Sequence, residues 1–84
     1  MNYRIDIDRS ARKGLEALDG QVHGRVVAAI RALAADPRPP GSLKMVNRDA
    51  WRIRIGNYRV VYEIHDQVLI IAVIEVGHRK EVYR

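Results

Sequence analysis

The chain contains no cysteine, which excludes disulfide bridges and metal sites built on thiolate ligands. Lysine is scarce, because only three of the fifteen cationic side chains are lysine and the other twelve are arginine. The amino-terminal residues lack the apolar stretch of a signal peptide, and no apolar run approaches the ~20 residues that a membrane-spanning helix needs. We therefore expect a cytoplasmic protein with no membrane partner.

The remaining composition is that of one small globular domain. The 84 residues are 48% apolar, which suits a packed core and predicts a single domain over residues 1–84. The net charge of +5 is carried almost entirely by arginine, whose planar fork matches phosphate geometry better than the lysine ammonium does. This balance favours nucleic acid or another acidic partner, although a solvated basic surface would explain the charge equally well.

Hydrophobic periodicity predicts an α+β fold with the order β-α-α-β-β-β. The predicted elements are a strand at 3–7, helices at 9–18 and 21–35, and strands at 51–55, 58–65 and 68–76. A proline-rich loop at 36–41 ends the second helix. We expect the helical hairpin to pack on one face of a mostly antiparallel, twisted sheet. The last strand is apolar on both parities, which predicts a central position with both faces buried.

Two details of the helices can be predicted from single residues. Asp8 or Ser10 can cap the first helix, since both carry side-chain oxygens that accept from free backbone N–H groups. Gly14 and Gly24 lie inside the predicted helices, where each costs about 1 kcal/mol relative to alanine. Close packing of the two helices against each other would account for both glycines.

The segment from Trp51 to Tyr62 has the pattern of a tight β-hairpin around Gly56-Asn57. The predicted cross-strand pairs are Ile55 with Tyr58, Arg54 with Arg59, Ile53 with Val60, and Trp51 with Tyr62. The apolar members of these pairs then share one face, which packs on the core. The other face carries Arg54 directly opposite Arg59, with Arg52 two residues away. Like charges that face each other destabilise a sheet by a few tenths to about 1 kcal/mol, so we expect this open face to meet a polyanion.

The chain resembles the RelE group of the RelE/ParE toxin superfamily over essentially its whole length. The resemblance rests on four motifs: Arg52-Ile-Arg54, Tyr58-Arg-Val-Val-Tyr62, the closing Val76-Gly-His-Arg-Lys-Glu-Val-Tyr83, and the Asp-Arg-Ser-Ala-Arg-Lys start of the first helix. It implies a RelE-like fold and a toxin of a type II toxin–antitoxin system. It further implies an endoribonuclease that cuts mRNA in the ribosomal A site without a cofactor or metal ion.

The resemblance also implies which residues act. The basic positions before the hairpin turn are Arg52 and Arg54, and the arginine of the Tyr-Arg pair after the turn is Arg59. A late arginine and a late tyrosine correspond to Arg79 and Tyr83. This chain departs from the best-known member by having arginine where that member has lysine at both strand positions. His78 likewise stands where that member has lysine.

Arginine remains protonated at any useful pH, so these guanidinium groups would stabilise charge rather than move protons. The candidates for proton transfer are His78, Tyr83 and Glu63. Each has an ordinary alternative, since Glu63 could pair with Arg52, His78 could be a turn residue, and Tyr83 could cover the core. Three further basic residues are candidates for gripping RNA phosphates: Lys44, Lys80 and Arg84.

The partners that the resemblance implies are mRNA, the ribosomal A site, and a small, acidic, helical RelB-like antitoxin. Two alternatives stay open. A ParE-like toxin on the same fold would inhibit DNA gyrase without cleaving RNA. A non-catalytic RNA-binding module or a decayed toxin would keep the basic surface and have no cleavage activity.

Overall fold

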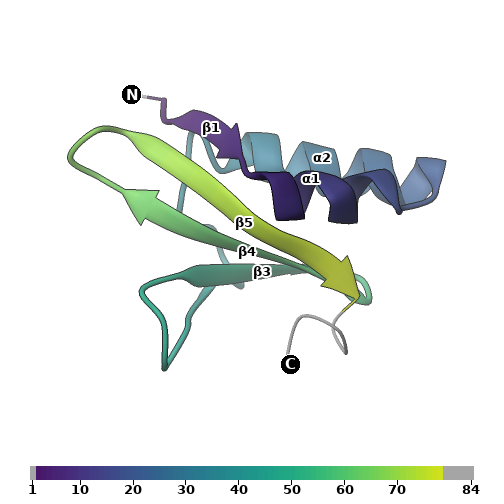
Figure 1. The fold of residues 1–84 in the computed structure, drawn as a ribbon. Coiled ribbons are helices and arrows are strands. Elements are labelled where there is room, and N and C mark those ends of the chain that lie inside the picture. The colour runs from purple at the N-terminus through teal and green to yellow at the C-terminus, as the bar shows by residue number, and fades with distance from the viewer. Residues whose placement is uncertain (1, 79–84) are drawn as a thin grey trace.

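A computed structural model describes residues 2–78 and confirms the α+β architecture (Figure 1). The elements in chain order are β1 (Arg4–Ile7), α1 (Arg9–Glu16), α2 (Gly20–Ala32), β2 (Leu43–Lys44), β3 (Trp51–Ile55), β4 (Tyr58–His65) and β5 (Ile70–His78). They form a five-stranded sheet in the order β1-β5-β4-β3-β2. The short strand β2 is an addition, since the sequence pattern predicts no strand between the proline loop and Trp51.

Both helices lie on one face of the sheet, α1 against β5 and α2 against β3 (Figure 1). Strand β1 pairs in parallel with β5, which places Ile5 beside Ile71 and Ile7 beside Val73, and the other pairings are antiparallel. The core lies between the two layers, where the buried residues Val26, Ile30, Val60, Tyr62, Ile71 and Val73 pack together. No helix in the described part of the chain covers the opposite face, so the sheet has one packed side and one side without a helical layer.

The helix termini follow from capping. Asp8 caps α1, because its Oδ1 accepts a hydrogen bond from the Ala11 backbone N–H at 3.1 Å. Both helices end two or three residues before the predicted limits, at Glu16 and Ala32. Past Ala32 the chain tightens into turns, with bonds such as Ala35 N to Ala32 O at 3.3 Å. The apolar periodicity continues through these turns, which is why it predicted longer helices.

The two helical glycines do not pack helix against helix, so that prediction is wrong. A Cβ on Gly14 would lie 2.0 Å from the carbonyl oxygen of Val76 on β5, whereas a Cβ on Gly24 would meet nothing within 4 Å. Gly14 therefore allows α1 to approach the backbone of β5. Gly24 has no such role.

Strand β5 is interior, as predicted, but only one of its faces is fully buried. Ile71, Val73 and Val76 are buried, while Ala72 and Ile74 are half-buried. A register shift at Val61/Tyr62 pairs these residues with Glu75 and Val73, which leaves Ile74 as the extra residue of a β-bulge. The bulge switches the buried parity within the strand. This switch, rather than burial of both faces, produces the apolar pattern on both parities.

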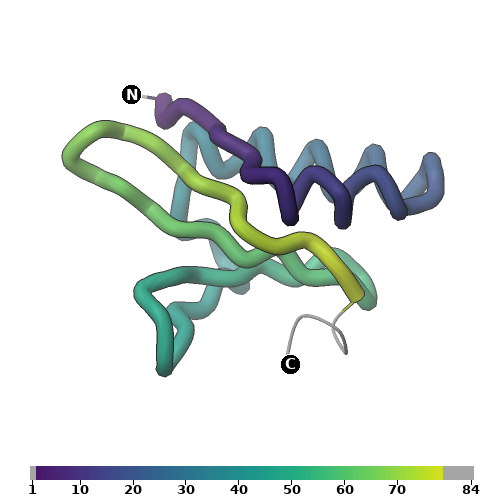
Figure 2. Tube along the Cα trace, in the orientation of Figure 1, coloured from purple at the N-terminus to yellow at the C-terminus, as the bar shows by residue number. Residues whose placement is uncertain are grey.

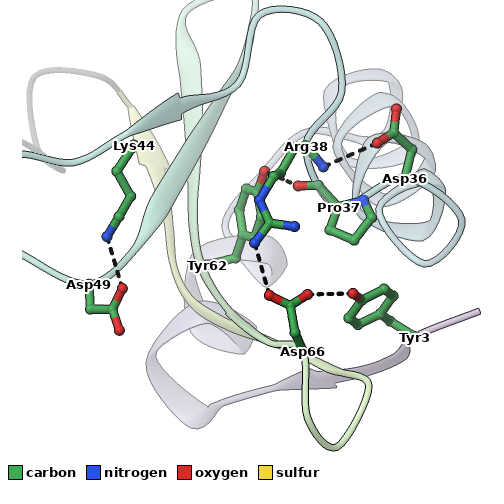
Figure 3. Close-up of polar contacts among 8 residues, drawn as sticks. All are labelled: Tyr3, Asp36, Pro37, Arg38, Lys44, Asp49, Tyr62 and Asp66. Carbon is green, nitrogen blue, oxygen red and sulfur yellow. Dashed lines mark hydrogen bonds and ion pairs between the residues drawn. The ribbon is translucent and has the colours of Figure 1, made fainter.

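The proline loop is held in place by side chains from three other parts of the chain (Figure 3). Asp66, in the β4–β5 turn, accepts from the Tyr3 hydroxyl and pairs with Arg38 NH2 at 3.0 Å. The Arg38 guanidinium also lies 5.3 Å from the ring centroid of Trp51, within cation–π range. The Arg38 hydrogen bond and the Tyr3 hydroxyl lower the pKa of Asp66 below its ordinary value.

Tyr62 also holds the proline loop, through a hydrogen bond from its hydroxyl. Its hydroxyl donates to the carbonyl oxygen of Pro37 at 2.7 Å, and its side chain is fully buried. Burial disfavours the phenolate and raises the pKa of Tyr62 to about 12. The loop that leads into β2 is therefore anchored at both Pro37 and Arg38.

Candidate nucleic-acid interface

The β3–β4 hairpin has the predicted register at every pair. Arg54 lies opposite Arg59, Ile53 opposite Val60, and Trp51 opposite Tyr62. Gly56 begins the turn with φ of 59°, a left-handed conformation that glycine adopts without steric cost. Because side chains alternate along a strand, this register places Arg52, Arg54 and Arg59 on the face opposite the helices. We call this surface the arginine face.

The three arginines of this face differ in burial. Arg54 is exposed and Arg52 is half-buried, but Arg59 is only 1% exposed. The prediction of an uncovered arginine patch is therefore wrong at Arg59, which lies on β4, the middle strand of the sheet. Gly77 is its neighbour on β5, so Arg59 has an arginine on one side and a residue without a side chain on the other. Arg54 on β3 and Arg59 on β4 therefore project on the same face from adjacent strands, and Arg54 is exposed whereas Arg59 is buried.

Acidic residues occupy the other half of the arginine face. Glu75 lies on β5 opposite Val61 and pairs with Arg48 NH1 of the β2–β3 loop at 2.9 Å. Glu63 lies further along β4 and contacts His65 Nε2 at 3.0 Å. Glu63 lies four positions along the strand from Arg59, about 13 Å at 3.3 Å per residue. The face is thus basic near the β3–β4 turn, and its carboxylates lie on β5 at Glu75 and further along β4 at Glu63.

Two predicted site residues have the opposite parity. Lys44 lies across from Trp51, on the side that faces the helices, and its ammonium pairs with Asp49 at 2.8 Å (Figure 3). His78 lies across from Tyr58, and their rings meet edge to face with centroids 5.6 Å apart. His78 is the last residue of β5, at the same end of the sheet as the β3–β4 turn (Figure 2). It therefore lies at the rim of the sheet rather than among the arginines.

The other four predicted positions lie outside the described residues: Arg79, Lys80, Tyr83 and Arg84. Sequence reasoning in turn missed Arg48, whose loop position has no periodic pattern to mark it. It also missed a pocket beside the arginines, lined by Pro40, Gly41, Leu43, Arg52, Ile53 and Arg54. The available signal was Leu43, an apolar residue shortly before the basic strand, but its pairing with Arg52 depends on the unpredicted β2.

Two further properties concern the described residues alone. Within residues 2–78 neither helix is both long and apolar enough to cross a bilayer. In the same range, His, Asp and Glu side chains form no cluster of three or more that could hold a metal ion. The arginine face offers guanidinium groups, which can bind phosphate and stabilise negative charge.

Comparison with known proteins agrees with this geometry. A family model described as the ParE toxin of type II toxin–antitoxin systems, parDE, matches residues 5–83. Toxin RelG of Mycobacterium tuberculosis is 29% identical over 86 residues, covering 100% of this chain and 99% of that protein.

Two solved structures are also similar. A double arginine-to-alanine variant of Escherichia coli toxin RelE in the free state is 28% identical with a TM-score of 0.81, covering 99% of this chain and 92% of that one. RelE in the archaeal RelE–RelB complex of Pyrococcus horikoshii is 26% identical with a TM-score of 0.79, covering 94% and 97%. The chain therefore belongs to the ParE toxin family of type II toxin–antitoxin systems, within the RelE/ParE toxin superfamily.

Proposed function

We propose that this toxin is an endoribonuclease that cleaves mRNA on the ribosome and so blocks translation. In the proposed reaction a ribose 2′-oxygen forms a bond to the adjacent phosphorus while the bond from phosphorus to the 5′-oxygen breaks. The 2′-hydroxyl loses a proton and the leaving 5′-oxygen gains one. The products are a 2′,3′-cyclic phosphate and a free 5′-hydroxyl, and the route needs no metal ion.

The observation that carries the proposal is the direct cross-strand pairing of Arg54 with Arg59. Facing like charges destabilise a sheet by up to about 1 kcal/mol, and holding a cation below the surface adds a desolvation cost. A phosphate bound at Arg54, with Arg59 behind it, would offset this repulsion by attraction to both guanidinium charges. Function, rather than stability, therefore gives the better account of this pair.

Negative charge grows on the phosphoryl oxygens during the reaction, and fixed cations lower that barrier. Arg54, at the surface, is suited to contact the scissile phosphate, with Arg59 behind it and Arg52 beside it on β3. The resemblance to RelE implies the same role for Arg79 and proton transfer by Tyr83. His78, at the rim of the sheet, would reach a substrate that passes over the β3–β4 turn. Glu63 is too far from Arg59 to act on the same phosphate.

A site that depends on electrostatics more than on a dedicated base needs its substrate held in place. Positioning of two reacting groups can contribute about 7–11 kcal/mol to the barrier. We therefore expect the ribosome to supply this positioning, and free RNA to be a poor substrate.

The test is cleavage by the purified toxin of a defined mRNA on translating ribosomes, with 5′ ends mapped and naked RNA as a parallel substrate. Arg54→Gln should reduce cleavage about 10²-fold, the usual effect of removing one charge-stabilising donor. Arg25→Gln, on the exposed surface of α2, makes the same charge change and should stay within about twofold of the wild type. No cleavage by the wild type, or equal cleavage of naked RNA, would refute the proposal.

Inhibition of DNA gyrase is the second candidate function. It is favoured by the ParE description of the matching family model and by the parity of His78, which turns away from the arginine face. A supercoiling assay with purified gyrase separates the two functions. Inhibition of supercoiling without ribosome-dependent cleavage would select this alternative.

We also propose a RelB-like antitoxin as the partner that neutralises the toxin. RelE relatives have been solved in complex with RelB, and a basic toxin surface would favour a small, acidic, largely helical partner. Co-expression with the protein encoded beside this gene should yield a stable complex by size-exclusion chromatography. Recovery of two separate peaks would count against that partner.

A further inference from the structure

We propose that the pocket between the proline loop and strand β3 binds the nucleotide next to the scissile phosphate. The inference rests on the proposed ribonuclease function and adds to it a specific base-binding subsite. Its lining combines four apolar or small residues with two guanidinium groups: Pro40, Gly41, Leu43 and Ile53, with Arg52 and Arg54. The volume is about 360 Å³, at the small end of the range for ligand sites, which suits one nucleotide rather than a peptide segment.

Leu43 is the feature of this pocket that most needs an explanation. It is one of the few large apolar side chains in the described residues that stand half-exposed, at 51%. It lies directly opposite Arg52, so it shares the arginine face with the two cations of the pocket. An apolar surface beside guanidinium groups fits a nucleotide, because the base stacks on apolar and guanidinium surfaces while the phosphate binds the charge.

The wall opposite the arginines is rigid enough to form a subsite. Ser42 N donates to Pro39 O at 3.0 Å within the loop, and the Arg38 backbone N–H donates to Asp36 Oδ1 at 3.2 Å. The loop is also fixed from outside, by Tyr62 at Pro37 and by Asp66 at Arg38 (Figure 3). A preformed wall lowers the entropy cost of ordering a bound nucleotide.

The charge distribution on the rest of the arginine face favours RNA binding on the side of this pocket. Glu75 on β5 and Glu63 further along β4 are both paired with basic side chains, Arg48 and His65, so a polyanion that leaves the Arg54–Arg59 pair toward them meets little net positive charge. In the other direction, toward β2, it meets Arg52, Leu43 and the proline loop. The strand of RNA is therefore expected to run from Arg59 past Arg54 to the edge of the sheet, which places one base in the pocket.

The experiment compares three single variants in the ribosome cleavage assay. Leu43→Ser removes the apolar surface, and we expect kcat/KM to fall about tenfold with a changed distribution of cleavage sites, since one base loses its stacking partner. Leu43→Met keeps an apolar side chain and should restore both properties to within about threefold. Val68→Ser makes a comparable change at a 63% exposed residue of the β4–β5 turn and should leave both unchanged.

The outcomes separate this inference from the proposed function. If the wild type does not cleave, the ribonuclease function itself is refuted, and the subsite with it. If the wild type cleaves and Leu43→Ser matches it in rate and in cleavage sites, the subsite is refuted and the ribonuclease stands. If Leu43→Ser instead weakens only the complex with the antitoxin, the pocket binds that protein and the inference is wrong.

Discussion

Gly14 offers the sharpest test of how the helical layer is fitted to the sheet. In Gly14→Ala the new Cβ would lie 2.0 Å from the Val76 carbonyl oxygen and 2.9 Å from its carbon, whereas ordinary contact begins near 3.4 Å. The obstructing atoms are backbone of an interior strand, so no side chain can rotate away. Helix α1 must therefore move outward by about 1.4 Å, or β5 must distort.

The expected magnitude combines two opposing effects. Overpacking of this kind costs about 1–3 kcal/mol, and the rigidity of the backbone places Gly14 at the upper end of that range. Alanine gains about 1 kcal/mol of helix propensity over glycine. The net loss is therefore about 2 kcal/mol of the free energy of unfolding, which corresponds to a fall in Tm of about 8–16 °C for a domain of this size.

Gly24→Ala is the matched control, because it makes the same substitution in the middle of α2 with nothing within 4 Å of the new Cβ. It should gain about 0.5–1 kcal/mol and raise Tm by about 2–8 °C. Urea and thermal unfolding followed by circular dichroism would measure both variants. Equal stability of the two would show that the contact between α1 and β5 is not as close as the structure places it.

Three smaller predictions concern caps and titrating groups. Asp8→Ala should cost about 1 kcal/mol in urea unfolding, because Ala11 N–H loses its cap acceptor; an unchanged midpoint would contradict that role. Because the pKa of Asp66 is lowered in the folded state, its carboxylate stabilises the fold above its unfolded pKa, and this stabilisation is lost as pH falls through the folded pKa. Asp66→Asn should therefore make Tm depend less on pH in the acid range, and Arg38→Gln should have the same effect. The pKa of Tyr62, raised to about 12, means that stability falls as pH rises from about 10 to 12, by about 2–3 kcal/mol, and Tyr62→Phe should abolish that alkaline loss in the same measurement.

Local signals predicted the hairpin completely. The alternation on both sides of Gly56-Asn57 set the register of β3 against β4 residue by residue, including the Arg54–Arg59 pair. The cap of α1 was narrowed to Asp8 or Ser10, of which the structure shows Asp8, since a cap depends on residues three apart in the chain. Both features are determined by neighbours in sequence, which is why the basic half of the arginine face could be predicted before the fold was known.

Features that depend on distant segments were not predictable in the same way. The contact between Gly14 and Val76 joins residues from different layers, and nothing near Gly14 in the sequence indicates it. The burial of Arg59 depends on its place in the sheet order, and an alternating pattern predicts parity but not depth. The pairing of Leu43 with Arg52 needs a strand of only two residues, too short to produce a period.

The β-bulge in β5 affects both the core and the arginine face, on which the proposed function depends. Without the bulge, a regular β5 with Val76 in the core would also have Ile74 in the core. Val73 and Ile71 would then point toward the arginine face. With the bulge, Val76 and Val73 are both buried, while Glu75 and Gly77 remain on the arginine face. Gly77 then adds no side chain over Arg59, and Glu75 pairs with Arg48. One inserted residue thus lets β5 complete the core and still keep Glu75 and Gly77 on the arginine face, where we propose that phosphate binds.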